Sequence, residues 1–352
     1  QKVTHPRFKA AILGATGTVG QRLVRRLHDH PWFRLTTVAA SARSAGRAYG
    51  DSVHWLLPTA LPDRVARMEV CEVSEVEDCD VVFSALGSAG ARELEPQLAG
   101  RGLMVVSNAS ALRMHPEVPL LIPEVNPDHL DMLDHQSFGS GGVVTNPNCA
   151  TVGLVLSLKP LADAFGIEAV QVTTLQAISG AGHPGVPSLD ILGNALPLIP
   201  GEEDKLETEP QKILGSVSGG AFSPAAFRVS AQTNRVPVVD GHLVSVSVKL
   251  NRPASPEAAR KAIEDFRSPV ADFDLPSAPR RPVIVAEDGP RPQPKLDVDR
   301  GEGMTVTVGR LRSCPVFDLR YVALVHNTER GAAGAAVLNA ELMAATGRLG
   351  RA

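Results

Sequence analysis

A single cysteine, Cys149, stands where the chain changes from an apolar run to a segment with helical spacing. The stretch TNPNCAT fills residues 145–151, after GGVV at 141–144 and before VGLVLSL at 152–158, which ends near Lys159 and Pro160. A thiol in the first turn of a helix faces unpaired backbone N–H groups and the positive end of the helix dipole. Both lower its pKa and favour the nucleophilic thiolate. The alternative is a buried structural cysteine, because free cysteine is among the most buried residue types.

A glycine-rich turn near the start of the chain has the context of a dinucleotide-binding fingerprint. FKAAIL at residues 8–13 predicts a buried strand, GATGTVG follows at 14–20, and QRLVRRL at 21–27 has helical spacing that stops before Pro31. Such glycines permit a tight turn and the close approach of a pyrophosphate to the helix N-terminus. The spacing is GxxGxxG rather than GxGxxG, so a glycine-rich turn without a ligand is the alternative.

The next predicted strand, 34–40, ends in Ser41, Arg43 and Ser44. An NAD-binding protein usually places Asp or Glu near this point to hold the ribose hydroxyls. Two hydroxyls and a guanidinium suit a 2′-phosphate instead, which favours NADP over NAD. A solvated surface arginine is the alternative.

His242 is the candidate acid–base residue, because an imidazole titrates near neutral pH. It opens a period-two strand at 243–250, where alternation puts it on one face with Val244, Val246 and Val248, so a core or interface histidine is the alternative. Arg235 lies seven residues earlier, before an Asp-Gly turn signal at 240–241. A tight hairpin would separate the two side chains by about 10 Å. If both serve one site, the connection is looser than that.

Two further segments carry charged candidates. Arg113 follows a predicted strand at 103–107 and can reach an anion, or it is a solvated loop arginine. Glu202 and Lys205 lie in a polar segment, 201–209, which otherwise indicates the charged, solvated start of a helix.

The elements that position these residues alternate between strands and helices up to Cys149. Further strands are expected at 65–70 and 80–84, and a turn into a helix is expected from Gly87. Repeated βα units predict a doubly wound parallel sheet, which binds ligands at the carboxyl ends of its strands. After Cys149, strands at 169–178, 227–231 and 243–250 follow without long intervening helices, which predicts a mainly antiparallel second domain.

Composition excludes several classes of protein. The chain has 352 residues, 21% of them charged, and a net charge of −3, so nothing indicates nucleic acid or a membrane surface as a partner. No apolar run reaches the roughly 18–20 residues that span a bilayer, and residues 1–6 lack the apolar core of a signal peptide. The four cysteines form no metal-binding spacing. We therefore expect a soluble cytoplasmic protein with reduced thiols and no metal.

Together these motifs resemble aspartate-semialdehyde dehydrogenase, most closely its archaeal and fungal branch. The resemblance runs in order from about residue 8 to 345 and rests on GATGTVG (14–20), SARSAG (41–46), VPLLIPEVN (118–126), TNPNC (145–149), QAISGAG (176–182), RVPVVDGH (235–242), RPQPKLD (291–297) and HNTERGAAGAAVLNAE (326–341). It implies an NADP-binding Rossmann-like domain at 8–148, completed by a C-terminal helix at 328–348. It also implies an α+β catalytic and dimerisation domain at 149–327 with a largely antiparallel sheet, in a homodimer or homotetramer.

The resemblance also implies a reaction: NADPH-dependent reductive dephosphorylation of L-aspartyl-4-phosphate to L-aspartate 4-semialdehyde, on the route to lysine, threonine, methionine and isoleucine. Cys149 would carry the acyl group as a thioester. His242 would act as general base and acid, Gln176 would orient the acyl group, and backbone N–H groups after Cys149 would stabilise the oxyanion. The resemblance assigns the substrate α-carboxylate to Arg235, the ammonium to Glu202, and the phosphate to Arg113, Lys205 and Asn148. It assigns the cofactor to Gly14, Thr16, Gly17, Thr18, Val19, Gly20, Ser41, Arg43, Ser44, Ser84, Ser179, Gly180 and Asn327.

This chain departs from the resembled pattern at Ala150, where a serine is common, and at His183 in the glycine-rich loop. Glu203 is adjacent to Glu202, and only the three-residue spacing to Lys205 favours Glu202. Two other functions remain open. A related reductase of an acyl phosphate or acyl-CoA, such as malonyl-CoA or N-acetylglutamyl phosphate, would keep Cys149 and His242 but have no use for Glu202. A catalytically silent NADP-binding protein would bind the cofactor without turnover.

Overall fold

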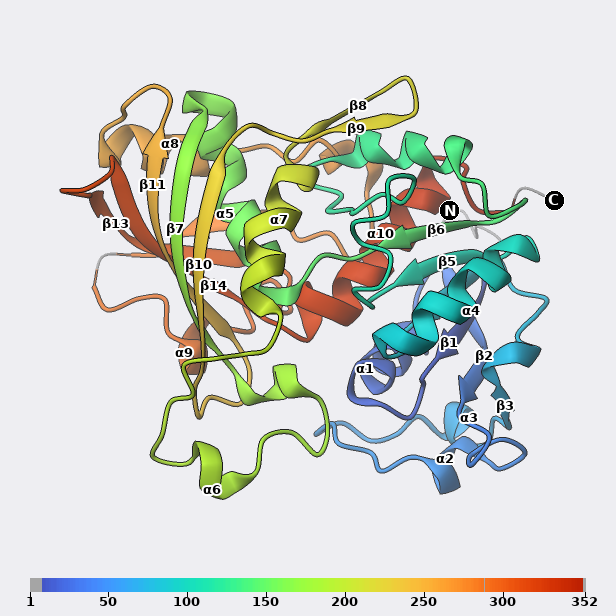
Figure 1. Cartoon of the computed structure of the whole chain (residues 1–352). Helices are drawn as coiled ribbons and strands as arrows, with labels where there is room; N and C mark the ends of the chain where they lie inside the picture. The colour runs from blue at the N-terminus through green and yellow to red at the C-terminus, as the bar shows by residue number, and fades with distance from the viewer. Residues whose placement is uncertain (1–7, 288, 351–352) are drawn as a thin grey trace, which may run out of the picture.

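The computed structural model describes residues 8–287 and 289–350, so residues 1–6, whose sequence lacks the apolar core of a signal peptide, lie outside the described residues. The described residues form two six-stranded sheets, a two-stranded sheet and the helices around them (Figure 1). The first contains β1 (Phe8–Leu13), α1 (Thr18–Leu27), β2 (Phe33–Ala40), α2 (Tyr49–Ser52), α3 (Asp63–Ala66), β3 (Val70–Glu72), β4 (Val81–Ser84), α4 (Ser88–Gly100), β5 (Met104–Ser107) and β6 (Gly142–Thr145).

The first sheet is parallel throughout, in the order β3-β2-β1-β4-β5-β6. One face packs against α1 and the C-terminal helix α10 (Gly334–Ala345), and α4 packs against the other. The predicted doubly wound sheet is therefore confirmed. The prediction of a strand at 65–70 is wrong. The short helix α3 begins at Asp63 after Pro62, and of residues 65–70 only Val70 belongs to β3.

The second sheet is mixed, in the order β10-β7-β11-β14-β13-β12. β11 pairs antiparallel with β7 and β14, and β13 with β14, whereas β10–β7 and β12–β13 are parallel. Its elements and those around it are α5 (Cys149–Phe165), β7 (Ile167–Gln176), α6 (Ser188–Ile191), α7 (Glu202–Ile213), β8 (Ser216–Ser218), β9 (Ala221–Ser223), β10 (Arg228–Arg235), β11 (His242–Leu250), α8 (Pro256–Glu264), β12 (Val283–Val285), α9 (Pro294–Asp297), β13 (Val306–Ser313) and β14 (Leu319–Val325).

Helix α5 forms the core of this second layer. It does not end at Pro160 as its sequence suggests but continues to Phe165, and Leu158 and Leu161 are fully buried on either side of the proline. Because these apolar side chains pack with the valines of β7 and β11, tertiary burial outweighs the missing backbone N–H of proline. The nucleophile candidate thus sits at the start of a well-anchored helix.

No helix in the described ranges is long and apolar enough to cross a membrane.

Candidate active site

Cys149 is the first residue of α5, directly after the carboxyl end of β6 and the turn 146–148. The Asn148 side chain caps the helix: its Oδ1 accepts hydrogen bonds from the backbone N–H groups of Ala150 (2.9 Å) and Thr151 (3.3 Å). Because these two donors are engaged by Asn148, they are not free for an oxyanion, contrary to the expectation from sequence.

The His242 imidazole faces the thiol. Its Nε2 atom lies 3.2 Å from Cys149 Sγ, and its Nδ1 atom accepts a hydrogen bond from the Ala177 backbone N–H at 3.0 Å. A backbone N–H only donates, so the neutral ring carries its proton on Nε2 and presents a donor to the sulfur. His242 is fully buried on the core face of β11.

Burial sets the protonation of this pair. It raises the pKa of the Cys149 thiol to about 12, with Glu202 adding to the rise and Arg113, Arg235 and Lys205 opposing it. Burial also lowers the pKa of His242 to about 3, helped by Arg235. Both groups are therefore neutral near pH 7. Desolvation thus outweighs the helix-dipole effect that the sequence suggested, and His242 does not titrate near neutral pH.

Arg235, Gln176 and His242 meet at one end of three adjacent strands. Arg235 at the end of β10 pairs in register with Gln176 at the end of β7, and β11 pairs with β7 on its other side, Leu243 opposite Leu175. No hairpin joins β10 to β11, because β7 lies between them. A non-local strand therefore brings Arg235 and His242 to the same site, and the Arg235 guanidinium is held by the Ala177 carbonyl at 2.7 Å.

Glu202 connects several of the predicted substrate residues. Its carboxylate accepts hydrogen bonds from Lys205 Nζ (2.6 Å), Asn148 Nδ2 (2.8 Å) and Gln176 Nε2 (3.4 Å). Burial alone would raise the pKa of Glu202, but Lys205 and these hydrogen bonds outweigh it and hold the pKa below its usual value. The adjacent Glu203 instead accepts the Thr233 backbone N–H. Glu202 is thus the glutamate of the pair that faces the site.

Arg113 is buried beside the nucleophile turn. Its Nη1 pairs with Glu209 at 3.0 Å, its Nη2 donates to the Asn108 carbonyl, and its Nε has no hydrogen-bond partner among the described residues. Sequence reasoning missed Glu209. Its spacing of seven from Glu202 puts both on one face of α7, which is the signal that could have found it.

One pocket of about 370 Å³ collects most of the predicted residues at the carboxyl ends of the parallel strands. Its lining includes Thr18, Val19, Arg113, Asn148, Cys149, Gln176, Ser179, Gly180, Glu202, Lys205, Arg235 and Asn327. Outside that lining are Gly14, Thr16, Gly17, Gly20, Ser41, Arg43, Ser44, Ser84 and His242. Of these, Ser84 is fully buried, so its hydroxyl does not reach the pocket.

The fingerprint turn fits a pyrophosphate. Gly14 has φ +70°, and a Cβ there would lie 2.7 Å from the Ala85 carbonyl oxygen, while one at Gly20 would lie 2.3 Å from the Gly14 oxygen. Helix α1 begins at Thr18 with no side-chain cap and no acidic residue in its first turn. Its leading backbone N–H groups and the helix dipole therefore favour an anion.

The pocket is also lined by Ser179, Gly180, Asn327 and Gly331. Asn327 donates to Ser179 Oγ at 2.8 Å and accepts from the Gly241 backbone N–H at 2.9 Å, which ties the glycine-rich loop to β11. A Cβ on Gly180 would lie 2.9 Å from Arg235 Nη1, and a Cβ on Gly331 would lie 2.6 Å from Cys149 Cβ. A side chain at 331 would therefore displace the Cys149 backbone, and one at 180 would displace the Arg235 guanidinium.

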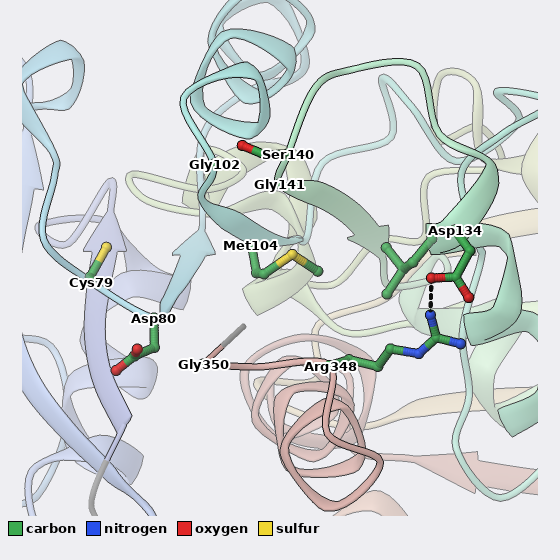
Figure 2. Close-up of a pocket in the computed structure, with 10 residues that line it drawn as sticks. Cys79, Asp80, Gly102, Met104, Asp134, Ser140, Gly141, Arg348 and Gly350 are labelled. Carbon is green, nitrogen blue, oxygen red and sulfur yellow. Dashed lines mark hydrogen bonds and ion pairs between the residues drawn. The ribbon is translucent and has the colours of Figure 1, made fainter. Parts of the chain in front are cut away.

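A second pocket, of about 240 Å³, lies at the amino ends of β4, β5 and β6, next to Cys79, Met104 and Arg348 (Figure 2). Because ligands of open parallel sheets bind at the opposite, carboxyl edge, we assign no function to it. Within residues 8–287 and 289–350, no group of three His, Cys, Asp or Glu side chains is placed to hold a metal ion.

Comparisons with known proteins agree with this geometry. A profile described as "Semialdehyde dehydrogenase, NAD binding domain" matches residues 9–133, and one described as "Semialdehyde dehydrogenase, dimerisation domain" matches 158–330. The chain is 50% identical over 341 residues to the aspartate-semialdehyde dehydrogenase of Archaeoglobus fulgidus, covering 96% of this chain and 98% of that protein. For the enzyme of Methanothermobacter thermautotrophicus the identity is 51% over 339 residues, covering 94% and 97%.

A solved structure is also similar. The crystal structure of aspartate semialdehyde dehydrogenase with NADP from Candida albicans superposes with a TM-score of 0.89 at 42% identity, covering 97% of this chain and 99% of that one.

Proposed function

The chain belongs to the aspartate-semialdehyde dehydrogenase family, and on that premise we propose that its pocket reduces L-aspartyl-4-phosphate to L-aspartate 4-semialdehyde with NADPH, releasing phosphate. The observation that carries the proposal is the Cys149 Sγ to His242 Nε2 contact of 3.2 Å, behind a pocket that Cys149 lines together with Arg235, Glu202 and the start of α1. A thiol, cationic anchors and a dinucleotide fingerprint around one cavity are the parts that this reaction needs.

Cys149 forms the covalent intermediate. Its sulfur attacks the acyl carbon, the bond from that carbon to the phosphate oxygen breaks, and the thiol proton leaves on the released phosphate. NADPH, when bound at the fingerprint turn, would supply the hydride that reduces the resulting thioester. The oxyanion formed at the acyl carbon then expels the Cys149 sulfur as a thiolate, which takes up a proton from water. We propose that His242 Nε2–H, 3.2 Å from the sulfur, donates to the thiolate and to that oxyanion. The role of His242 as a general base stays a prediction.

Two anchors select an amino-acid substrate. Arg235, buried beside Cys149 with one guanidinium nitrogen tied to Ala177, offers its remaining donors to the α-carboxylate. The Glu202 carboxylate binds the substrate ammonium, which replaces Lys205 Nζ as its partner. Gln176, which donates to the same carboxylate, orients the acyl group.

Arg113, Lys205 and Asn148 bind the phosphate. Arg113 Nε is buried without a hydrogen-bond partner among the described residues, and Asn148 directly precedes the nucleophile. Lys205 Nζ turns from Glu202 to the phosphate when the ammonium occupies that carboxylate. The same charged groups thus change partners when the substrate binds.

The fingerprint residues Gly14, Thr16, Gly17, Thr18, Val19 and Gly20 would hold the pyrophosphate at the start of α1. Ser179, Gly180 and Asn327, which line the same pocket, would bind the nicotinamide half of the cofactor. Ser41, Arg43 and Ser44 follow the end of β2 next to this turn, and Ser41 and Arg43 are exposed, in position to bind a 2′-phosphate. The NADP-bound Candida albicans structure supports this choice of cofactor. For Ser84 we propose only a role in packing at the end of β4.

We assign NADP binding to residues 8–148 with the helical segment 328–348, and catalysis and dimerisation to 149–327. The dimerisation-domain match supports an oligomer, a homodimer or homotetramer. The outward face of the mixed sheet, with Leu175 41% exposed on β7 and Leu243 half-buried on β11, is the surface we propose for the contact. Four free cysteines suit the reducing cytoplasm, where we place the enzyme.

One assay tests the reaction. We expect NADPH to form from aspartate semialdehyde and NADP only when phosphate or arsenate is present, and this activity to disappear in Cys149→Ser. Activity that persists in Cys149→Ser would refute the covalent mechanism. Turnover with coenzyme A but not phosphate would assign the chain to the acyl-CoA reductases, and NADP binding without any turnover would identify a silent protein.

A further inference from the structure

Helix α7 presents four charged side chains on one face, at positions 202, 205, 209 and 212. The first two, Glu202 and Lys205, line the pocket, whereas Glu209 and Lys212 do not. Glu209 is nonetheless 1% exposed and Lys212 6% exposed. Burying charged groups is unfavourable unless their partners are well placed, so their contacts indicate what the second half of this face does.

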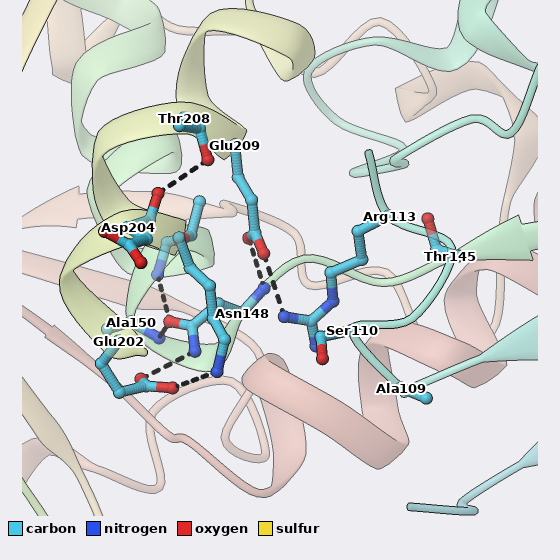
Figure 3. Close-up of polar contacts among 12 residues, drawn as sticks. Ala109, Ser110, Arg113, Thr145, Asn148, Ala150, Glu202, Asp204, Thr208 and Glu209 are labelled. Atoms are coloured by element: carbon cyan, nitrogen blue, oxygen red, sulfur yellow. Dashed lines mark hydrogen bonds and ion pairs between the residues drawn. The ribbon is translucent and has the colours of Figure 1, made fainter. Parts of the chain in front are cut away.

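Glu209 joins two parts of the site that lie far apart in sequence. Its Oε1 accepts from Arg113 Nη1 at 3.0 Å, and its Oε2 accepts from the Asn148 backbone N–H at 2.7 Å (Figure 3). The Glu209 carboxylate therefore fixes the position of the Arg113 guanidinium, which we assign to the phosphate, relative to Asn148, the residue before Cys149.

Lys212, on the next turn of α7, holds the main chain at and after Arg113. Its Nζ donates to the carbonyls of Arg113 (2.8 Å), His115 (2.8 Å) and Val118 (2.7 Å), and it lies 4.4 Å from the centre of the Phe222 ring. Segment 113–118 is thus bound to α7 twice, through the Arg113 side chain to Glu209 and through its main-chain carbonyls to Lys212. Helix α7 therefore fixes the position of Arg113.

We infer that Glu209 is a positioning residue that presets Arg113 for the phosphate of the substrate, an inference that rests on the proposed function. Glu209 lies outside the pocket lining and acts through Arg113 and Asn148. Its ion pair fixes the orientation of the Arg113 guanidinium, and the Arg113 side chain lines the pocket where the phosphate would bind. Preorganised donors need no rearrangement when the anion binds, which is their advantage.

Glu209→Gln tests this role. The amide oxygen can still accept from Asn148 N–H, but the amide NH₂ then faces Arg113 and the ion pair is lost, while the Cys149 turn keeps its anchor. In the aspartate semialdehyde oxidation assay we expect the KM for phosphate to rise about tenfold or more, the size expected for one charge-assisted hydrogen bond, with the KM for aspartate semialdehyde within about twofold of wild type.

Glu207→Gln is the matched control, because this carboxylate lies on the same helix but accepts the Ala231 backbone N–H of β10. We expect its KM for phosphate to stay at the wild-type value. In an Arg113→Ala background, Glu209→Gln should change the KM for phosphate by less than about twofold, because the residue through which Glu209 acts is gone. If Glu209→Gln does not fold, Glu209→Asp, whose shorter side chain reaches only one of the two partners, provides the same measurement.

An unchanged KM for phosphate in an active Glu209→Gln enzyme would overturn the inference, as would an equal rise in the KM of every substrate. A wild-type enzyme with no phosphate-dependent turnover would instead refute the proposed function, so the two failures are distinguishable.

Discussion

The Nδ1 atom of His242 accepts a hydrogen bond from the backbone N–H of Ala177 at 3.0 Å. This contact places the imidazole proton on Nε2, toward Cys149 Sγ at 3.2 Å. Full release of that proton would leave an imidazolate, whereas a hydrogen bond from Nε2–H requires no proton transfer. The relationship therefore favours His242 as a fixed donor to the sulfur and to the oxyanion that follows.

Substitution of His242 distinguishes a donor from a base. Gln places an amide N–H near the position of Nε2 but cannot take up a proton, whereas Ala supplies neither group. We expect His242→Ala to lose about 10²–10³ in kcat, the cost of one oxyanion donor, and His242→Gln to retain at least about tenfold more activity. Steady-state kinetics on both variants provides the comparison, and equal losses would support proton transfer instead.

The reactivity of the Cys149 thiol should depend steeply on pH. Because burial raises its pKa to about 12, the thiolate fraction in the unliganded enzyme grows tenfold for each pH unit between 7 and 10, without a plateau. Alkylation by iodoacetamide, followed peptide by peptide by mass spectrometry, measures this rate.

Cys314 serves as the internal control for this experiment. Burial is the largest single effect and raises the pKa of Cys314, but hydrogen bonds from the Phe317 and Val316 backbone, with Ser247 and Arg320, together outweigh it and hold the pKa below its usual value. Its alkylation should level off within the same pH range. A Cys149 rate that is already constant above pH 7 would indicate a preformed thiolate–imidazolium pair and contradict the neutral pair described above.

Gly331 should be required for the position of the nucleophile. A Cβ there would lie 2.6 Å from Cys149 Cβ and 2.9 Å from its Cα, atoms that move only with the backbone of α5. We expect Gly331→Ala to lower kcat about tenfold to a hundredfold, because displacements of about 1 Å at a reacting centre have effects of this size. Gly90→Ala in α4, where nothing lies within 4 Å of the new methyl group, should leave kcat unchanged.

Arg43 should determine the preference for NADP. We expect Arg43→Ala to raise the KM for NADP about tenfold or more through loss of a charge-assisted contact to the 2′-phosphate, and to leave the KM for NAD unaltered. Arg47→Ala is the matched control, because this exposed arginine donates to the Asp51 carbonyl. Efficient use of NAD by the wild-type enzyme would show that the residues after β2 do not select the 2′-phosphate.

The sequence by itself determined the local elements around the site. The strand, glycine turn and helix of residues 8–27, the cysteine at the start of α5 and the period-two strand at 243–250 all appear in the structure, because periodicity and glycine geometry act over a few neighbouring residues. Short or interrupted patterns were less informative: 65–70 is not one strand, and Pro160 does not end α5.

Only the tertiary structure decided how the residues meet and how they are charged. β7 lies between Arg235 and His242, Glu209 joins Arg113 to Asn148, and Ala177 fixes the His242 proton, all through contacts between distant parts of the chain. The thiol pKa likewise follows from desolvation in the folded core rather than from its position at a helix terminus. Burial and long-range contacts depend on the whole fold, so they could not be predicted from the spacing of neighbouring residues.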